Sequence, residues 1–305
     1  MTPISIILPV YNGKKYIEQS VNSLLEQQFS DFELLIVDDC STDGCWEYLQ
    51  GLKDDRISLY RNEKNSGLFY NLNFLVKRSN SPIIKIWSQD DVMYPDCIKD
   101  VVDFHQQHPE ISFSYTDRDY IDASGAIIEI KQYDTTPEIV SPELHTKIAC
   151  ITGSIAGNIS NVAINKKVLD EVGLFNESMK ISGDFEMWVR LAKNYSVGFI
   201  KKRLVQLRNH NEQLSVEEKY LIYHVKEDLE AYKILFGYIT PKQQIEGRKL
   251  LRNSKLLFYY TLMLKAFFRG DFAIAYKFFK LLSSFDNFFI ITWYFFKNKV
   301  FSKIS

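Results

Sequence analysis

The stretch ISIILPVYNGKKYIEQSVNSLLEQQFSDFELLIVDDCSTDG, residues 4–44, decides the fold. Two continuous apolar runs, ISIIL and ELLIV, flank a segment at residues 14–28 that has a helical pattern. Continuous apolar runs separated by a helix are typical of parallel strands that are covered on both faces. The stretch therefore predicts a strand, a helix and a second, parallel strand.

The same alternation continues beyond residue 44, with the apolar runs RISLY and IIKIW followed by helical patterns. From residue 219 the chain reads as helices only. We predict an α/β fold: a Rossmann-like, mainly parallel sheet, followed by an all-helical C-terminal region. The expected domains are a catalytic domain over residues 1–218, with halves at about 1–100 and 101–218, and a helical region over residues 219–305.

The N-terminal residues and the cysteines indicate the compartment and the kinds of site that the chain can form. The N-terminal residues lack the pattern of a secretory signal, so we expect the catalytic part in the cytoplasm. The cysteines form no C-x-x-C pair, which argues against a disulfide framework or a zinc site. They are Cys40, Cys45, Cys97 and Cys150.

Charge is distributed unevenly along the chain. Residues 240–305 carry 12 Lys/Arg and 3 Asp/Glu, a net charge of +9, whereas the other residues carry 25 bases and 35 acids. Basic helices rich in Phe and Tyr suit the inner face of the cell membrane, or a helical subdomain docked on the catalytic core. FFIITWYFF is too short to span a bilayer, so we predict peripheral association through residues 240–305. The acidic part argues against a nucleic-acid partner.

Polar clusters follow three predicted strands: PVYNG, DDCSTD and SQDD. The carboxyl ends of parallel strands meet at one edge of a sheet, where ligands bind. Some residues near these clusters suit helix caps, namely Ser41, Thr42, Asp43 and Asp96. Others follow strands with no arginine in the local sequence, namely Asp38, Asp39, Asp90 and Asp91. Concentrated carboxylates of this kind indicate Mg²⁺ or Mn²⁺, with substrate phosphates completing the shell.

Two other ligand sites are excluded by the sequence. PVYNG has one glycine and lacks the G-x-G-x-x-G pattern of a dinucleotide site. The segment that begins at Asp39 has Ser41 at the third position and Gln50 at the twelfth, and a strand precedes it, so it is not an EF-hand.

Together, residues 5–44 and SQDDVMYP resemble the family 2 glycosyltransferases of the A-type (GT-A) fold, over residues 4–215. That resemblance implies a nucleotide-diphosphate sugar donor. Its nucleotide would lie across Pro9, Tyr11 and Asp39, with Asn65 beside it.

Asp90 and Asp91 match the D-x-D position of that family. The resemblance implies that Asp91 holds a divalent metal, Mn²⁺ or Mg²⁺, on the diphosphate and that Asp90 reaches the ribose or the sugar. LRNHNEQLS, residues 207–215, resembles a late Arg-x-His element, which implies that His210 joins the metal shell.

SGDFEMWVRLA, residues 182–192, is similar to the acidic pair before a tryptophan-bearing helix in that family. The position that matches the catalytic base is Asp184, although an aspartate at a helix start is also a common cap. Glu186 is the second candidate for the base. Trp188 suits either the core or a platform for an acceptor sugar.

The expected activity is metal-dependent transfer of a sugar, with inversion, to a saccharide or lipid-linked saccharide acceptor. That activity would serve the synthesis of a surface polysaccharide such as a capsule or O-antigen. Two alternatives stay open: a non-catalytic module that binds a nucleotide sugar, and a metal-dependent nucleotidyltransferase.

Overall fold

The computed structural model describes residues 2–128, 134–210 and 220–301. The chain divides into two compact units. The first comprises Met1–Ser141, Ala156–Ser178 and Asn194–Asn211, and the second Pro142–Ile155, Met179–Lys193 and Glu212–Ser305. This division differs from the boundary expected after residue 218, because two earlier segments pack with the C-terminal helices.

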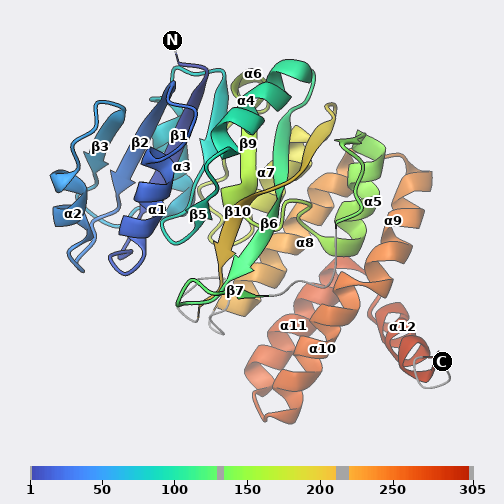
Figure 1. The fold of residues 1–305 in the computed structure, drawn as a ribbon. Coiled ribbons are helices and arrows are strands. Elements are labelled where there is room, and N and C mark those ends of the chain that lie inside the picture. Colours follow the sequence, from blue (N-terminus) through green and yellow to red (C-terminus); the bar gives the residue numbers. More distant parts are fainter. Residues whose placement is uncertain (1, 129–133, 211–219, 302–305) are drawn as a thin grey trace. The chain divides into compact units, whose positions relative to one another are not determined.

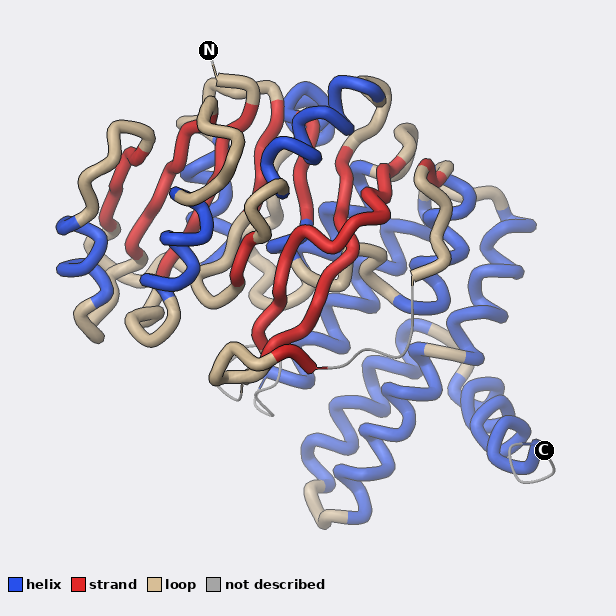
Figure 2. The backbone as a smooth tube through the Cα atoms, viewed as in Figure 1, coloured by secondary structure: helices blue, strands red, loops and turns tan. Residues whose placement is uncertain are grey.

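The first unit is built on a mixed, mostly parallel sheet with the strand order β3-β2-β1-β4-β9-β6-β10-β5 (Figures 1 and 2). The strands are β1 Ile4–Val10, β2 Phe32–Asp38, β3 Ile57–Arg61, β4 Ile83–Ile86, β5 Val92–Met93, β6 Phe113–Ile121, β9 Val162–Asn165 and β10 Val197–Arg208; β7 Ile127–Ile128 and β8 Ile139–Val140 pair with β6 and β10. β9 runs antiparallel to both β4 and β6, and β10 runs parallel to β6. The predicted mainly parallel α/β sheet is confirmed.

Helices cover this sheet because its strands are apolar on both faces. They are α1 Ile17–Leu25, α2 Cys45–Gly51, α3 Leu68–Val76, α4 Cys97–Gln107 and α6 Lys166–Val172, and a short 3₁₀ turn, η1, spans Ile159–Asn161. Alternate residues of β1, such as Ile6 and Leu8, form one core with α1 and α4. Figure 1 shows α3 on the far side of the strands, where it contacts β1 and β2.

Strand direction gathers the polar motifs. β1, β2 and β4 are mutually parallel, and the two antiparallel steps through β9 leave β6 and β10 pointing the same way. The residues that follow β1, β2, β4 and β10 therefore meet at one edge, here called the donor edge.

The second unit consists of helices: α5 Pro142–Thr152, α7 Gly183–Leu191, α8 Leu221–Gly237, α9 Pro241–Asn253, α10 Lys255–Phe268, α11 Phe272–Phe285 and α12 Phe288–Phe301. Phe185 and Val189 of α7 enter the core that these helices share. Thr240 caps α9 through a capping box with Gln243. Over the described ranges, no helix has both the length and the apolar character needed to cross a bilayer.

Candidate active site

The loops after β1 and β2 are tied together by side chains. Asn12 has a left-handed backbone (φ 48°), and its Oδ1 accepts a hydrogen bond from the Thr42 backbone N–H at 2.9 Å. The Asp43 carboxylate accepts from the Lys14 N–H at 2.8 Å. These bonds fix Tyr11, which is 47% exposed, at the donor edge.

Gln89 joins the loop after β4 to the loop after β1. Its side-chain amide donates to the Tyr11 carbonyl at 3.0 Å and accepts from the Tyr11 N–H at 2.8 Å. A Cβ on Gly13 would lie only 2.4 Å from this amide, so glycine leaves the space that the pair occupies. Pro9, the last proline before this loop, is half-buried near the end of β1.

Asp39 organises the loop at residues 62–67. Its Oδ1 accepts from the Asn62 amide at 2.7 Å and from the Ser66 N–H at 2.8 Å, and its Oδ2 accepts from the Gly67 N–H at 2.9 Å. Asn65 is exposed within this loop. The structure thus brings two predicted donor residues, Asp39 and Asn65, to one place. A carboxylate offers about four acceptor positions, so Asp39 can still accept a further bond.

Asp90 and His210 form a pair at the donor edge. The Nε2 atom of His210 lies 2.9 Å from Oδ2 of Asp90, and the Ser88 hydroxyl donates to Oδ1 of Asp90 at 2.6 Å. The His210 ring also lies 4.9 Å from the Tyr16 ring, centroid to centroid. Two residues 120 positions apart thus meet because β4 and β10 end at the same edge. Residues 211–215 of the predicted late element lie outside the described residues.

Asp91 is buried beside this pair. Its Oδ1 accepts from the Arg208 backbone N–H at 2.8 Å, whereas Oδ2 has no hydrogen-bond partner among the residues described. Burial, and then the charge of Asp90, raises the pKa of the Asp91 carboxyl to about 8. A buried carboxylate with a free oxygen is the arrangement that a bound cation would stabilise.

The side chains available as metal ligands at the donor edge fit Mn²⁺ or Mg²⁺ only in part. Carboxylate oxygens and an imidazole suit these ions. Within the described ranges, however, no three His, Cys, Asp or Glu side chains are grouped to hold a metal by themselves. Mg²⁺ typically takes one or two carboxylates and completes its shell with substrate phosphates and water. Asp91 and His210 therefore fit a metal that arrives with a diphosphate.

Two buried bases near the site were not predicted as functional. Arg208, 2% exposed, donates through its guanidinium to the carbonyls of Asp90 and Asp122 and to the Gln19 side chain. Lys85, fully buried in β4, donates to the carbonyls of Ser160 and Val162. The sequence signal for Lys85 was a charged residue inside the apolar run IIKIW. For Arg208 the signal was its place in the Arg-x-His element, but its contacts with Gln19, Asp90 and Asp122 are distant in sequence.

Asp184, in the second unit, lies in the first turn of α7 and is half-buried. Burial above all, with the charges of Asp228 and Glu227 added to it, raises the pKa of its carboxyl to about 7. Both acids are on α8. A carboxyl with this pKa is half ionised near neutral pH, as a general base requires.

Glu227 also holds the chain that leads into α7. Its Oε1 accepts from the Lys180 N–H, and its Oε2 accepts from the Ile181 and Ser182 N–H groups, each at 2.9 Å. Since three backbone donors point at one buried carboxylate, the start of α7 is fixed by a helix of the C-terminal region. Glu227 was not predicted, because it lies 45 positions from Ser182 in the sequence and no local pattern indicates the contact.

Glu186, the second candidate for the base and a candidate acceptor contact, and Trp188, the candidate acceptor platform, are both buried in α7, which argues against these roles. Glu186 is 4% exposed and pairs with Arg190 at 2.7 Å, so its carboxylate is neutralised within α7. Trp188 is fully buried, so its ring has no face on which a saccharide could stack. Of the alternatives weighed for Trp188, the core is the correct one.

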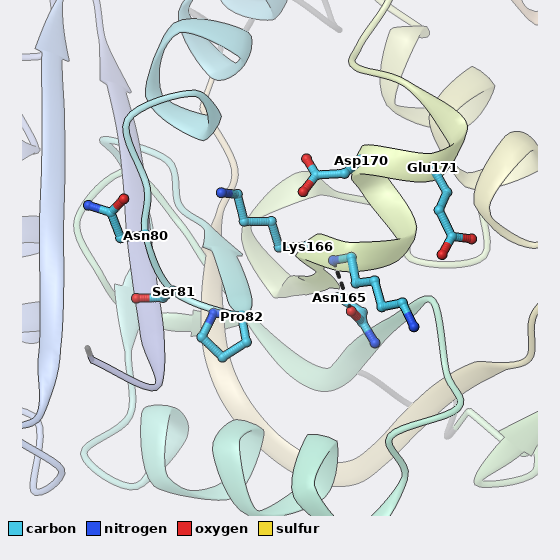
Figure 3. Close-up of a pocket in the computed structure, with 8 residues that line it drawn as sticks. Asn80, Ser81, Pro82, Asn165, Lys166, Asp170 and Glu171 are labelled. Atoms are coloured by element: carbon cyan, nitrogen blue, oxygen red, sulfur yellow. Dashed lines mark hydrogen bonds between the residues drawn. The ribbon is translucent and has the colours of Figure 1, made fainter.

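A surface depression lies at the other edge of the sheet (Figure 3). The loop before β4 lines it with Asn80, Ser81 and Pro82, and α6 contributes Lys166, Asp170 and Glu171. Asn80–Pro82 precede β4, whereas Asp90 follows it. The depression is therefore separate from the donor edge.

Comparisons with known proteins agree with this arrangement. The family model described as Glycosyl transferase family 2 matches residues 5–171. An uncharacterised glycosyltransferase of Rickettsia conorii is 28% identical over 214 residues, which are 70% of this chain and 35% of that protein. The putative teichuronic acid biosynthesis glycosyltransferase TuaG of Bacillus subtilis is 25% identical over 256 residues, 81% of this chain and 97% of TuaG. The chain spans 34–41% of the length of three Rickettsia relatives.

Solved structures share the fold. TarS residues 1–349 of S. aureus, in complex with UDP-GlcNAc, has a TM-score of 0.62 at 20% identity, covering 78% of this chain and 71% of that chain. The mannosyltransferase PcManGT of Pyrobaculum calidifontis, in complex with GDP-Man and Mn²⁺, has a TM-score of 0.57 at 14% identity, covering 82% and 70%. The fold is therefore of the GT-A type. Since the family model covers more than half of the chain and its motifs meet at the donor edge, the chain belongs to glycosyl transferase family 2.

Proposed function

We propose that the protein is an inverting, metal-dependent glycosyltransferase that uses a nucleotide-diphosphate sugar. The observation that carries the proposal is the assembly, at one sheet edge, of the Asp90–His210 pair with buried Asp91, whose Oδ2 has no partner among described residues. This arrangement suits a cation that arrives with a diphosphate, because the neighbouring carboxylates of Asp90 and Asp91 repel each other and a divalent ion would offset that repulsion.

Each part of the donor edge has a role in this proposal. The nucleotide lies across Pro9, Tyr11 and Asp39, next to Asn65, and Asp90 contacts the ribose or the sugar. Asp91 and His210 would hold Mn²⁺ or Mg²⁺, which would stabilise the negative charge that develops on the leaving diphosphate. Arg208 orients Asp91 through its backbone N–H and keeps the carbonyl of Asp90 in place.

Asp184 is the proposed base. Its carboxylate takes the proton from the acceptor hydroxyl while that oxygen attacks the anomeric carbon, and the bond to the diphosphate breaks. One displacement inverts the configuration at that carbon. The pKa of about 7 supports this role, because a carboxylate with an ordinary pKa near 4 would be a weaker base.

The proposed acceptor is a saccharide, free or lipid-linked, in the synthesis of a surface polysaccharide. TuaG is named for the biosynthesis of teichuronic acid, and TarS was crystallised with UDP-GlcNAc, which supports polymer synthesis and a UDP-sugar as the first donor to test. GDP-mannose, the ligand of PcManGT, is the second. The basic C-terminal region would keep the enzyme at the inner membrane surface, close to lipid-linked acceptors.

The test is a panel of UDP- and GDP-sugars with Mn²⁺, Mg²⁺ or chelator, for the wild type and Asp184→Asn. We expect metal-dependent release of nucleoside diphosphate by the wild type and at least a 10²-fold lower rate for the variant, with unchanged donor Kd. Donor binding without any turnover would favour the non-catalytic module. Release of pyrophosphate would favour a nucleotidyltransferase.

A further inference from the structure

The turn between α10 and α11 carries three exposed phenylalanines in one cluster. The Phe267 ring lies 5.6 Å from the Phe268 ring and 5.3 Å from the Phe272 ring, centroid to centroid. Their exposed fractions are 51%, 80% and 62%. We call these three residues the aromatic tip. A contiguous apolar cluster that stays open to solvent marks an interaction surface.

The apolar surface continues from the tip along α11. One face of this helix places Phe278, Leu282 and Phe285 in the core of the second unit. Tyr276 and Phe279 lie four and seven residues after Phe272, on the same face of the helix as Phe272, and are 56% and 39% exposed, although the Phe279 ring also contacts Phe288 at 4.8 Å. Tyr276 and Phe279 therefore extend the apolar surface of the tip along α11.

Basic residues surround this surface. Lys265 and Arg269 are exposed on either side of the Phe267–Phe268 pair, and Lys277 and Lys280 are exposed on α11. The acid in the turn, Asp271, accepts a hydrogen bond from the Ile274 N–H at 3.0 Å as the cap of α11. An apolar centre within a positive rim is complementary to an anionic bilayer, which presents phosphates above hydrocarbon. A second copy of this region would bring the same positive charge and would be repelled.

We propose that the aromatic tip inserts into the boundary of an anionic membrane. The three rings enter below the headgroups, while Lys265 and Arg269 contact lipid phosphates. Segments of this kind lie about 5–10 Å deep, which corresponds to one or two turns at the end of a helical hairpin. This proposal rests on the proposed function, because a lipid-linked acceptor would explain why the enzyme binds a membrane.

The test is co-sedimentation of the full chain with vesicles of phosphatidylcholine alone or with 30% phosphatidylglycerol. We expect selective binding to the anionic vesicles. The variant F267S/F268S/F272S should partition at least tenfold more weakly. K265Q/R269Q should bind several-fold more weakly and with a smaller dependence on salt. The matched control is Ile245→Ser, because Ile245 is 72% exposed on α9 and should leave the partitioning unchanged.

Three results would overturn the insertion: equal binding of wild type and triple variant, equal binding to neutral and anionic vesicles, or a wild-type dimer that the triple substitution converts to a monomer. Thermal melts establish that each variant is folded. The triple variant should hydrolyse a soluble nucleotide sugar at the wild-type rate. If the protein binds vesicles through the aromatic tip but turns over no nucleotide sugar, the proposed function is refuted. The membrane insertion would still be supported.

Discussion

Glu227→Gln tests whether the C-terminal helices position the proposed base. The Glu227 carboxylate accepts three backbone N–H bonds, each at 2.9 Å, from the residues that lead into α7. Glutamine keeps one acceptor oxygen and turns an NH₂ group toward the remaining donors, so one or two charge-assisted bonds are lost. At about 1.5–3 kcal/mol for each such bond, we expect the free energy of unfolding to fall by about 1.5–6 kcal/mol.

The effect on the rate follows from the displacement of α7. If its first turn moves by about 1 Å, transfer should fall on the order of 10²-fold. The Kd of the donor should not change, because the donor residues belong to the first unit. The charge of Glu227 also raises the pKa of Asp184, so the midpoint of the pH profile should move to lower pH in the variant.

The assay combines urea unfolding, calorimetric binding of the donor and kcat from pH 5 to 9. The matched control is Glu230→Gln on the same helix, where the Lys226–Glu230 pair at 3.8 Å is 57% and 43% exposed, and we expect no measurable change. A Glu227→Gln protein that is destabilised but has wild-type kcat and the wild-type pH midpoint would refute the positioning role.

Four further results are expected. The pKa of Asp184 is raised to about 7, so kcat should rise about tenfold per pH unit below that value and level off above it; a flat profile from pH 5 to 8 would exclude Asp184 as the base. Gly13→Ala places a Cβ 2.4 Å from the Gln89 amide and should raise KM for the donor more than it lowers kcat, whereas Gly51→Ala, with open space around it, should do neither. Asp39→Asn removes the charge that holds the loop at residues 62–67. If each charged bond contributes about 1.5–3 kcal/mol, the Kd of the donor, measured by calorimetry, should rise by roughly tenfold. An unchanged Kd would contradict this. Arg208→Lys cannot reproduce the guanidinium contacts with two carbonyls and Gln19, so donor-dependent Mn²⁺ affinity should fall, while Arg203→Lys, half-exposed on the same strand, serves as the control.

Local patterns in the sequence determined the architecture of the first unit. The apolar runs ISIIL, ELLIV and IIKIW could become strands only if both faces were covered, and strand direction then placed Asp39, Asp90 and Asp91 at one edge. The spacing of motifs along the chain thus predicted which residues meet there. The start of α9 is likewise encoded locally, because Thr240 is its N-cap and Pro241 its first residue.

Only the tertiary structure decided the contacts between residues that lie far apart in the chain. Arg208 reaches Gln19 across 189 positions, His210 reaches Asp90 across 120, and Glu227 holds the start of α7. No local propensity encodes such pairs, because each depends on the summed geometry of the strands and helices between its members. The same reason explains Trp188: its helical spacing is compatible with a buried or an exposed ring, and the packing of the surrounding helices made it part of the core.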